Sequence, residues 1–299
     1  MRWSHDTRAD GPRAEFHADP LVTANLVFAG SDAEPTAHLY AFDPGSGQVV
    51  WKTPAPGGVA FGVLAKGGRG FALDMRGQVF SFELATGQRL WTFEDAREEA
   101  RPPGAPALAG DRIFFASRSG AVRALDLGSG RVLWKRSLGE TLNTSVLVVK
   151  SHILVGTMGG RLHRLDAATG VVAGTLETGG PALGTLVEAG GCIVSLSAPA
   201  TVACVAPDLG RVRWRQTAPE EISSFRPLVL GSLVIVGGND GAVIAYRLED
   251  GTEIWRRHVR GAARGLGASA GVLYVGTLRG TVSAIRLPEG PDKPKPAAR

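Results

Sequence analysis

The chain has 299 residues, of which 44% are hydrophobic and 20% charged, the composition of an ordinary globular protein rather than a disordered or fibrous one. Its formal net charge of +5 is too small to indicate a nucleic acid as the partner. No run of apolar residues is long enough to cross a bilayer, so a transmembrane segment is not expected.

The N-terminal stretch MRWSHDTRADGPRAEF lacks an apolar segment of signal-peptide length. As written, the sequence therefore predicts a cytoplasmic protein. The alternative is a periplasmic or other extracytoplasmic protein from which a signal has been removed.

The stretch Val79–Glu94, VFSFELATGQRLWTFE, shows the unit from which the chain is built. Apolar residues alternate before Thr86-Gly87 and again after it, which predicts two strands joined by a tight turn. Glycine suits this reversal because it tolerates a positive φ. The unit recurs roughly every 40 residues, a period typical of β-propeller blades. The turn glycines are Gly47, Gly87, Gly130, Gly170, Gly210, Gly251 and Gly290.

Each period also contains two further short apolar segments ahead of this hairpin, which makes about four strands. The sequence therefore predicts an all-β fold, a seven-bladed β-propeller of four-stranded antiparallel blades within residues 1–290. The seventh period supplies no outer strand, whereas Met1–His5 resembles one. We expect this N-terminal strand to pair with Thr281–Leu287, completing blade seven and closing the ring. Residues 291–299 are rich in Pro and Lys, so a disordered tail is expected.

The turn pattern carries a family resemblance. AFDPGSGQVVW (Ala41–Trp51) and ALDLGSGRVLW (Ala124–Trp134) match the tryptophan-docking motif AxDxxTGxxxW, and AYRLEDGTEIW (Ala245–Trp255) matches it less fully. The chain thus resembles the PQQ-like β-propeller repeat family over residues 1–290. That family includes quinoprotein dehydrogenases, a periplasmic lipoprotein that helps assemble outer-membrane barrels, and sensor or scaffold domains. The resemblance to the non-enzymatic members is the closer one.

The resemblance implies that the motif tryptophans pack between neighbouring blades as structural docking residues. The fourth repeat has Gly174 where the others have Trp, so this blade interface is expected to be less filled, and Gly174→Trp is expected to be tolerated. The docking residues expected on this basis are Trp3, Trp51, Trp91, Trp134, Trp214 and Trp255.

Quinone-dependent catalysis is not expected. The related dehydrogenases have eight blades, hold PQQ over calcium and use an adjacent-cysteine disulfide. This chain has seven periods, no Cys-Cys pair and no Asp-rich calcium loop. The histidines form no HxH or HExxH motif, and no serine lies in a GxSxG context. We therefore predict no catalytic residues, no metal site and no cofactor.

Binding residues in a propeller are expected on the loops between blades and between the second and third strands of each blade. Arginines beside an aromatic and an amide suit a protein interface or an acidic ligand. Acidic residues lie on the same face (Glu98, Glu99, Glu220, Glu221, Asp240), so no purely basic surface results. The candidate partner-binding residues are Arg76, Arg118, Asn143, Phe225, Arg226, Arg264 and Arg279.

The function that the sequence favours is a non-enzymatic scaffold that binds a protein or peptide through this loop face and the central funnel. We expect a monomeric propeller that works within an assembly. The alternative is a ligand- or PQQ-binding propeller, a degenerate quinoprotein.

The two cysteines, Cys192 and Cys204, lie on the two strands of one predicted hairpin. A three-residue loop at Ala198–Ala200 would place Cys204 opposite Val194, so the thiols would be diagonal neighbours. Diagonal partners are roughly 7–8 Å apart, which is longer than a disulfide prefers. We therefore expect two buried, reduced thiols.

Overall fold

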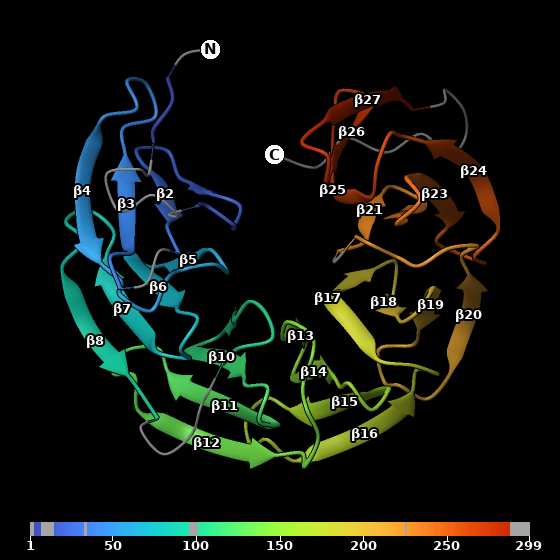
Figure 1. The fold of residues 1–299 in the computed structure, drawn as a ribbon. Helices are drawn as coiled ribbons and strands as arrows, with labels where there is room; N and C mark the ends of the chain where they lie inside the picture. The colour runs from blue at the N-terminus through green and yellow to red at the C-terminus, as the bar shows by residue number, and fades with distance from the viewer. Residues whose placement is uncertain (1–2, 7–14, 33–34, 96–100, 225, 288–299) are drawn as a thin grey trace. The chain divides into compact units, whose positions relative to one another are not determined.

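The structure is a computed structural model that describes residues 3–6, 15–32, 35–95, 101–224 and 226–287. Within these ranges the regular elements are 27 β-strands, most of them labelled in Figure 1, and no helix. The described residues accordingly include no helix suited to spanning a membrane. The chain divides into two compact units, Met1–Leu142 and Asn143–Arg299.

The first unit contains three antiparallel sheets of four strands, which we number sheets 1 to 3, and each is ordered as its strands follow in the chain. Sheet 1 comprises β1 (Leu21–Val22), β2 (Val27–Gly30), β3 (His38–Phe42) and β4 (Val49–Pro54). Sheet 2 comprises β5 (Val63–Lys66), β6 (Arg69–Leu73), β7 (Val79–Glu83) and β8 (Arg89–Phe93). Sheet 3 comprises β9 (Ala107–Ala109), β10 (Arg112–Ala116), β11 (Ala121–Asp126) and β12 (Val132–Ser137).

The second unit contains three more sheets of four strands and a last sheet of three. Sheet 4 comprises β13 (Leu147–Val149), β14 (His152–Gly156), β15 (Arg161–Asp166) and β16 (Val172–Glu177). Sheet 5 comprises β17 (Ala182–Ala189), β18 (Cys192–Ser197), β19 (Thr201–Val205) and β20 (Val212–Thr217). Sheet 6 comprises β21 (Leu228–Leu230), β22 (Leu233–Gly237), β23 (Ala242–Arg247) and β24 (Glu253–His258). Sheet 7 comprises β25 (Ala263–Ser269), β26 (Val272–Thr277) and β27 (Val282–Arg286).

These seven sheets confirm the predicted all-β class and the repeated antiparallel blade. The described part of the seventh sheet has three strands, as expected from the missing outer strand. The predicted tail at 291–299 lies outside the described residues, and the single domain over 1–290 stays a prediction.

Burial follows strand position in sheets 2 to 6. Their second and third strands are mostly buried, as in β10 and β11, whereas β27, the third strand of sheet 7, alternates between exposed and partly buried residues. The outer strands alternate between partly buried and exposed residues, as in β4 and β16. Apolar clusters join successive sheets, for example Phe28 and Leu39 with Phe80 and Phe82 in the first unit. The core is therefore a series of layers between sheets.

A short glycine turn joins the third and fourth strands of most sheets. The turn glycine donates its N–H to the carbonyl four residues earlier, as Gly47 does to Asp43 and Gly130 does to Asp126, at 2.9 and 2.8 Å. The Asp126 carboxylate accepts bonds from the N–H and hydroxyl of Ser129. These bonds lower the pKa of Asp126 below its usual value, because they stabilise the charged form.

The indole rings of four tryptophans, Trp3, Trp51, Trp91 and Trp214, pack against these turns. The indole of Trp51 lies so close to Gly87 that a Cβ there would be 2.5 Å from the ring, so only glycine fits. Each indole N–H donates to the carbonyl three residues before the turn glycine: Trp3 to Pro44, Trp51 to Leu84, Trp91 to Leu127 and Trp214 to Leu248, at 2.8–3.2 Å. Each of these bonds connects an outer-strand residue, or Trp3, to the turn of another sheet.

Trp134 and Trp255 complete the predicted docking set. Trp134 is opposite Ala124 in the register of β11 and β12, and its ring lies 6.0 Å from that of Phe114. Trp255 is 9% exposed and packs in one cluster with Leu287. Its Nε1 is buried and has no hydrogen-bond partner among the described residues. The turn that would receive it includes Gly290, which lies outside those residues.

One ion pair in the first unit is buried. Arg123 on β11 is fully buried, and its Nη2 donates to Asp95 Oδ2 at 2.7 Å. Lys135 Nζ contacts the same carboxylate at 3.3 Å. Asp95 follows β8, so the pair connects sheet 2 to sheet 3.

The cysteine prediction is wrong, although the predicted register is right. Val194 is opposite Cys204, yet Cys192 and Cys204 form a disulfide with Cα atoms 5.5 Å apart. The right-handed twist of a sheet brings one of its two diagonals closer than a flat ladder would. This distance falls within the range that a disulfide spans. The bridge is buried in the cluster between sheets 5 and 6.

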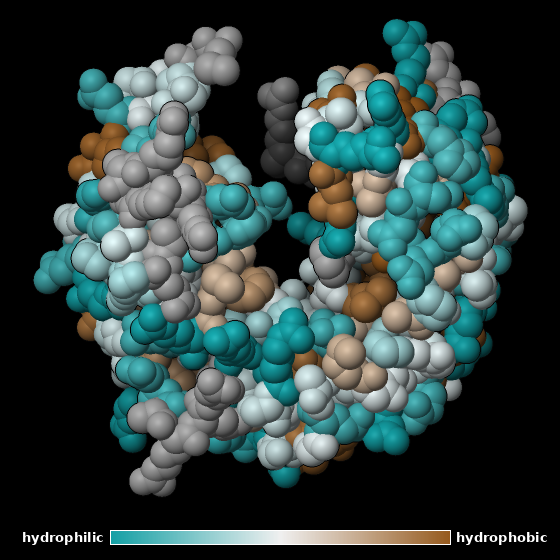
Figure 2. Space-filling model, viewed as in Figure 1, coloured by the Kyte–Doolittle hydropathy of each residue, from teal (hydrophilic) through white to brown (hydrophobic). Residues whose placement is uncertain are grey.

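Hydrophilic residues cover most of the face shown in Figure 2, and the hydrophobic groups on it are small and separate. The partner-binding residues are therefore sought among individual turns rather than on one broad apolar patch.

Candidate partner-binding surface

The turns between the second and third strands carry several of the predicted binding residues. In the first unit, Met75 and Arg76 lie between β6 and β7, and both are exposed. Asp74 before them is buried, and its Oδ1 accepts the N–H groups of Arg76 and Gln78 at 3.0 and 2.8 Å. A buried carboxylate thus fixes the turn that presents Met75 and Arg76.

Arg118 occupies the equivalent turn of sheet 3 and is exposed. Its backbone N–H donates to the carbonyl of Arg101 at 2.8 Å, which holds the turn against the preceding loop. The side chain points out from a fixed backbone, as a contact residue requires.

In the second unit, Leu278 and Arg279 form the turn between β26 and β27. Both are exposed. A Cβ at Gly261 would lie 2.9 Å from Cγ of Arg279, so this glycine makes room for the arginine stem. Arg279 is thereby oriented by the loop that precedes β25.

Asn143 lies in the loop before β13 and has a partner within the protein. Its Nδ2 donates to the carbonyl of Ala182 at 2.7 Å, and its backbone N–H donates to Gly156 at 2.9 Å. These bonds connect sheets 4 and 5, so Asn143 helps to hold the surface in place.

The remaining predicted residues differ in their exposure to solvent. Arg226 is exposed beside Pro227, and Arg264 on β25 is partly buried. Phe225, Glu98 and Glu99 lie outside the described residues. Of the acidic residues, Glu221 accepts a bond from Asn239 Nδ2 at 2.8 Å, and Asp240 Oδ1 accepts the N–H of Ala242 at 2.8 Å.

The sequence analysis missed three apolar residues on these turns. Met75, Met158 and Leu278 are 39, 45 and 66% exposed at the same kind of turn. Each begins a three-residue turn that ends in glycine. A large apolar side chain in such a turn is visible in the sequence and could have marked these residues as candidates. Two of them directly precede a predicted arginine, Arg76 or Arg279. Met, Leu and Arg side chains of this kind suit a protein contact better than a small polar ligand.

The described residues hold no group of three or more His, Cys, Asp or Glu side chains placed to bind a metal. The surface offers exposed apolar and guanidinium groups on fixed turns. Its chemistry is that of recognition.

A family model described as outer membrane protein assembly factor BamB matches residues 2–150, 118–194 and 158–292. BamB of Shewanella oneidensis is 29% identical over 217 residues, which are 64% of this chain and 54% of that protein. BamB of Yersinia pestis is 28% identical over 169 residues, 52% of this chain and 43% of that protein. The chain therefore spans about half the length of the curated relatives it matches.

Among solved structures, BamB from Moraxella catarrhalis superposes with a TM-score of 0.73 at 19% identity, covering 90% of this chain and 84% of that one. A computationally designed protein, Ika8, gives a TM-score of 0.70 at 13% identity over 93% of this chain and 98% of its own. Both show the likeness of the fold. The named relatives are assembly factors and not dehydrogenases, in agreement with the predicted non-enzymatic class.

Proposed function

The chain belongs to the family described as outer membrane protein assembly factor BamB, built from PQQ-like propeller repeats, and from this membership we propose that it binds a protein partner during outer membrane protein assembly. The observation that carries the proposal is the pairing of an exposed apolar residue with an arginine on a fixed turn. Met75 with Arg76 and Leu278 with Arg279 are the two instances.

Arginine is enriched at interface hot spots, and methionine is enriched at protein interfaces. The apolar side chain loses water on contact, and the neighbouring guanidinium can donate to carboxylates or carbonyls of the partner. Because each turn is held by its own hydrogen bonds or packing, little backbone conformational entropy is lost on binding. The expected partner is a protein of the same assembly process. The proposal leaves no role for PQQ.

The test is co-purification of the chain with the outer membrane assembly complex of its own organism, with the bound subunits identified by mass spectrometry. The variants Met75→Ala/Arg76→Ala and Leu278→Ala/Arg279→Ala should each reduce recovery of the partner about tenfold, since one hot spot contributes 1–2 kcal/mol or more. The control Arg131→Ala/Val171→Ala changes exposed residues at the third-to-fourth-strand turns and should bind as the unaltered protein does. Equal recovery with all three variants would reject the proposed surface.

We also propose that the N-terminal strand completes sheet 7 and closes a seven-bladed ring. Two observations, one in each unit, support this. Trp3 occupies the turn of sheet 1 just as the outer-strand tryptophans occupy their turns, yet it belongs to no strand of sheet 1. In the other unit, β27 ends its sheet as the third strand, with Val282 74% exposed.

The cytoplasmic placement expected from the N-terminal residues finds no support, and we propose the periplasmic alternative. The relatives are named for outer membrane protein assembly. The Cys192–Cys204 disulfide agrees with this, because disulfides persist in oxidising compartments such as the periplasm.

A further inference from the structure

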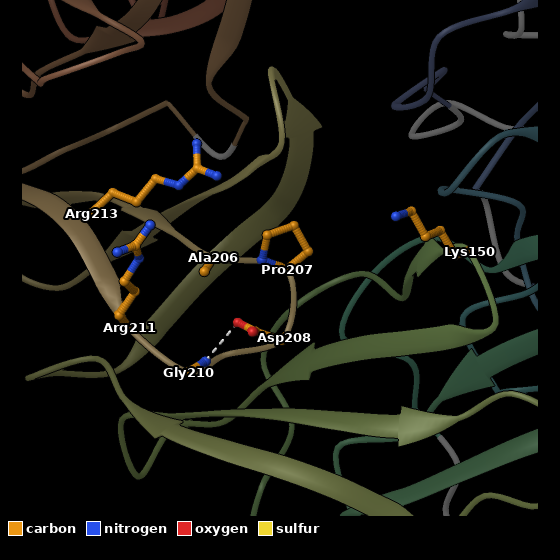
Figure 3. Close-up of a pocket in the computed structure, with 7 residues that line it drawn as sticks. All are labelled: Lys150, Ala206, Pro207, Asp208, Gly210, Arg211 and Arg213. Carbon is orange, nitrogen blue, oxygen red and sulfur yellow. Dashed lines mark hydrogen bonds between the residues drawn. The ribbon is translucent and has the colours of Figure 1, made fainter.

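One corner of the second unit departs from the internal repeat. A cavity of about 530 Å³ lies there, between the turn joining β13 to β14 and the turn joining β19 to β20 (Figure 3). Arg211 and Arg213 lie together on one side of it, and Lys150 lies across from them with its ammonium group directed toward Pro207. The lining residues are Lys150, Ala206, Pro207, Asp208, Gly210, Arg211 and Arg213.

The tryptophan that covers the corresponding turn in other repeats is absent here. Position 174 is glycine, and a Cβ at this position would meet the carbonyl oxygen of Asp208, in the cavity wall, at 3.4 Å. The turn itself also differs. Leu209 N–H donates to the carbonyl of Ala206, in place of the longer-range bond of the glycine turns. The turn between β19 and β20 therefore has no tryptophan over it, and its hydrogen bonding differs from that of the glycine turns.

The charge of this turn differs from that of the first four repeats. Ala206 stands where those turns have an acidic residue (Asp43, Glu83, Asp126 and Asp166), whereas the last two repeats have Arg247 and Arg286 there. Arg213 stands where the other outer strands have an apolar residue: Val50, Leu90, Leu133, Ala173 and Ile254. One acid is lost and one base gained at a single corner.

The backbone of Lys150 adds to this evidence. Its φ is +54°, in the left-handed region that favours glycine. Glycine occupies the equivalent turn position in four other repeats, at Gly67, Gly110, Gly190 and Gly231, and Ala270 occupies it in sheet 7 with a φ of +50°. Leu209 beside the cavity also has a positive φ, +62°. Strained non-glycine residues of this kind gather at functional sites.

The basic groups are available for a ligand. Lys150 and Arg211 form no side-chain hydrogen bond or ion pair with any other residue that the structure describes, and Arg213 has one long bond, to the carbonyl of Gly190 at 3.5 Å. Asp208 is the single acid of the lining, and its Oδ1 already accepts the N–H of Gly210 at 2.9 Å. Three cations and one carboxylate give the lining a formal charge of +2.

We propose that this corner binds a phosphate monoester group. A phosphate monoester carries a charge of about −1.5 to −2 at neutral pH, which matches the lining. Guanidinium forks pair with phosphate oxygens in a bidentate manner, and lysine adds a point charge. The cavity volume falls within the range of roughly 300–1,000 Å³ seen for small-molecule sites, so it has room for more than the phosphate. A soluble phosphate ester and a lipid headgroup share this chemistry.

The test measures binding of glucose 6-phosphate to the full chain by calorimetry, with glucose as the uncharged control. Sedimentation with phosphatidylcholine vesicles that contain phosphatidic acid is the second arm. Binding of glucose 6-phosphate indicates a soluble ester, and binding to the vesicles alone indicates a lipid headgroup. Absence of binding in both arms overturns the proposal.

Three variants locate the site. Arg211→Gln should lower the affinity about tenfold through loss of one charge-assisted pairing, and Ala206→Asp should do the same by restoring the acid of the repeat. The matched control is Arg131→Gln, which changes the arginine at the same repeat position as Arg211 but beside Asp126, and it should leave the affinity within about twofold. Circular dichroism and thermal melting verify that each variant is folded. Unchanged affinity in Arg211→Gln and Ala206→Asp, or tighter binding of an acidic peptide than of the phosphate ester, would overturn the assignment.

Discussion

An indole N–H that donates a hydrogen bond to a backbone carbonyl stabilises the packing of one sheet against the turn of the next sheet. Trp214 and Trp255 form a natural comparison, because they occupy the same repeat position and are 7 and 9% exposed. Trp214 Nε1 donates to Leu248 at 2.8 Å, whereas Trp255 Nε1 has no partner among the described residues.

Phenylalanine retains most of the ring and removes the N–H. Trp214→Phe should therefore reduce the free energy of unfolding by about 0.5–1.5 kcal/mol, since it removes the hydrogen bond to the partly buried Leu248 carbonyl. Trp255→Phe loses a similar ring area and no hydrogen bond to any described residue, so its loss should be the smaller one. Chemical denaturation of both variants measures the difference, and equal losses would mean that ring area alone matters.

Acid should weaken the third-to-fourth-strand turns. Hydrogen bonds from Ser46 lower the pKa of Asp43, and those from Ser129 and Thr169 act likewise on Asp126 and Asp166. A carboxylate whose folded pKa lies below the unfolded value of about 3.9 adds stability above that value, and this stability is lost as the pH falls through the folded pKa.

The melting temperature should thus fall as the pH is lowered below about 4. Asp126→Asn should show a shallower fall, because one of the contributing groups no longer titrates. Glu249→Gln is the control, since its carboxylate accepts no hydrogen bond within the described chain. A parallel pH dependence in the wild type and Asp126→Asn would show that these turns do not contribute.

The disulfide should contribute measurably to stability. Cys192 and Cys204 are 12 residues apart, and closing a loop of this size constrains the unfolded chain by about 2–3 kcal/mol. Titration in denaturant without reductant should find no reactive thiol. Cys192→Ala/Cys204→Ala should melt at a lower temperature, and reductant should lower the melting temperature of the wild type alone. Two reactive thiols in the untreated protein would contradict the bridge.

At the scale of the element, the interface between sheets 4 and 5 departs from the others. A Cβ at position 174 would be in ordinary van der Waals contact with Asp208, so the backbone accepts a side chain there. Leu209 is buried in the same interface with Leu176 and Val149, and it supplies part of the apolar contact that a docked indole provides elsewhere.

Gly174→Trp is therefore expected to be tolerated or mildly stabilising, because it adds apolar contact and removes a glycine from a strand. Thermal melting measures the effect, with Gly174→Ala separating the backbone contribution from that of the ring. A clear loss of stability in Gly174→Trp, with Gly174→Ala unaffected, would mean that Leu209 and its turn already fill the slot.

At the scale of the whole molecule, we propose that the N-terminal strand closes the ring. Deleting residues 1–8 should lower the melting temperature by several degrees or more, because it removes the indole from the Gly47 turn and leaves an open sheet edge. Trp3→Ala should account for part of the loss and the missing strand for the rest. Removal of residues 291–299 is the control and should have little effect. An unchanged melting curve after the N-terminal deletion would exclude closure by this strand.

The sequence by itself determined the repeat and the strand order within each sheet. These follow from period and residue type, which are local properties of the chain, since a glycine turn and an alternating strand are specified within a few residues. The docking role of Trp51, Trp91 and Trp214 was implied by the family resemblance that the turn motif carries. The arginines of the loop face were also identifiable, because their turns could be counted from the repeat. The exposed neighbours Met75 and Leu278 were not, because the sequence does not show how much of a turn side chain stays in water.

Tertiary structure decided the rest. The Cys192–Cys204 bridge depends on sheet twist, which shortens one diagonal, and the residue count that placed Val194 opposite Cys204 contains no information about twist. The basic cavity brings Lys150 together with Arg211 and Arg213 from another sheet, 61 and 63 positions further along the chain (211 − 150 and 213 − 150). Such proximity arises from the packing of one sheet against the next, and the spacing of residues along a single strand does not specify it.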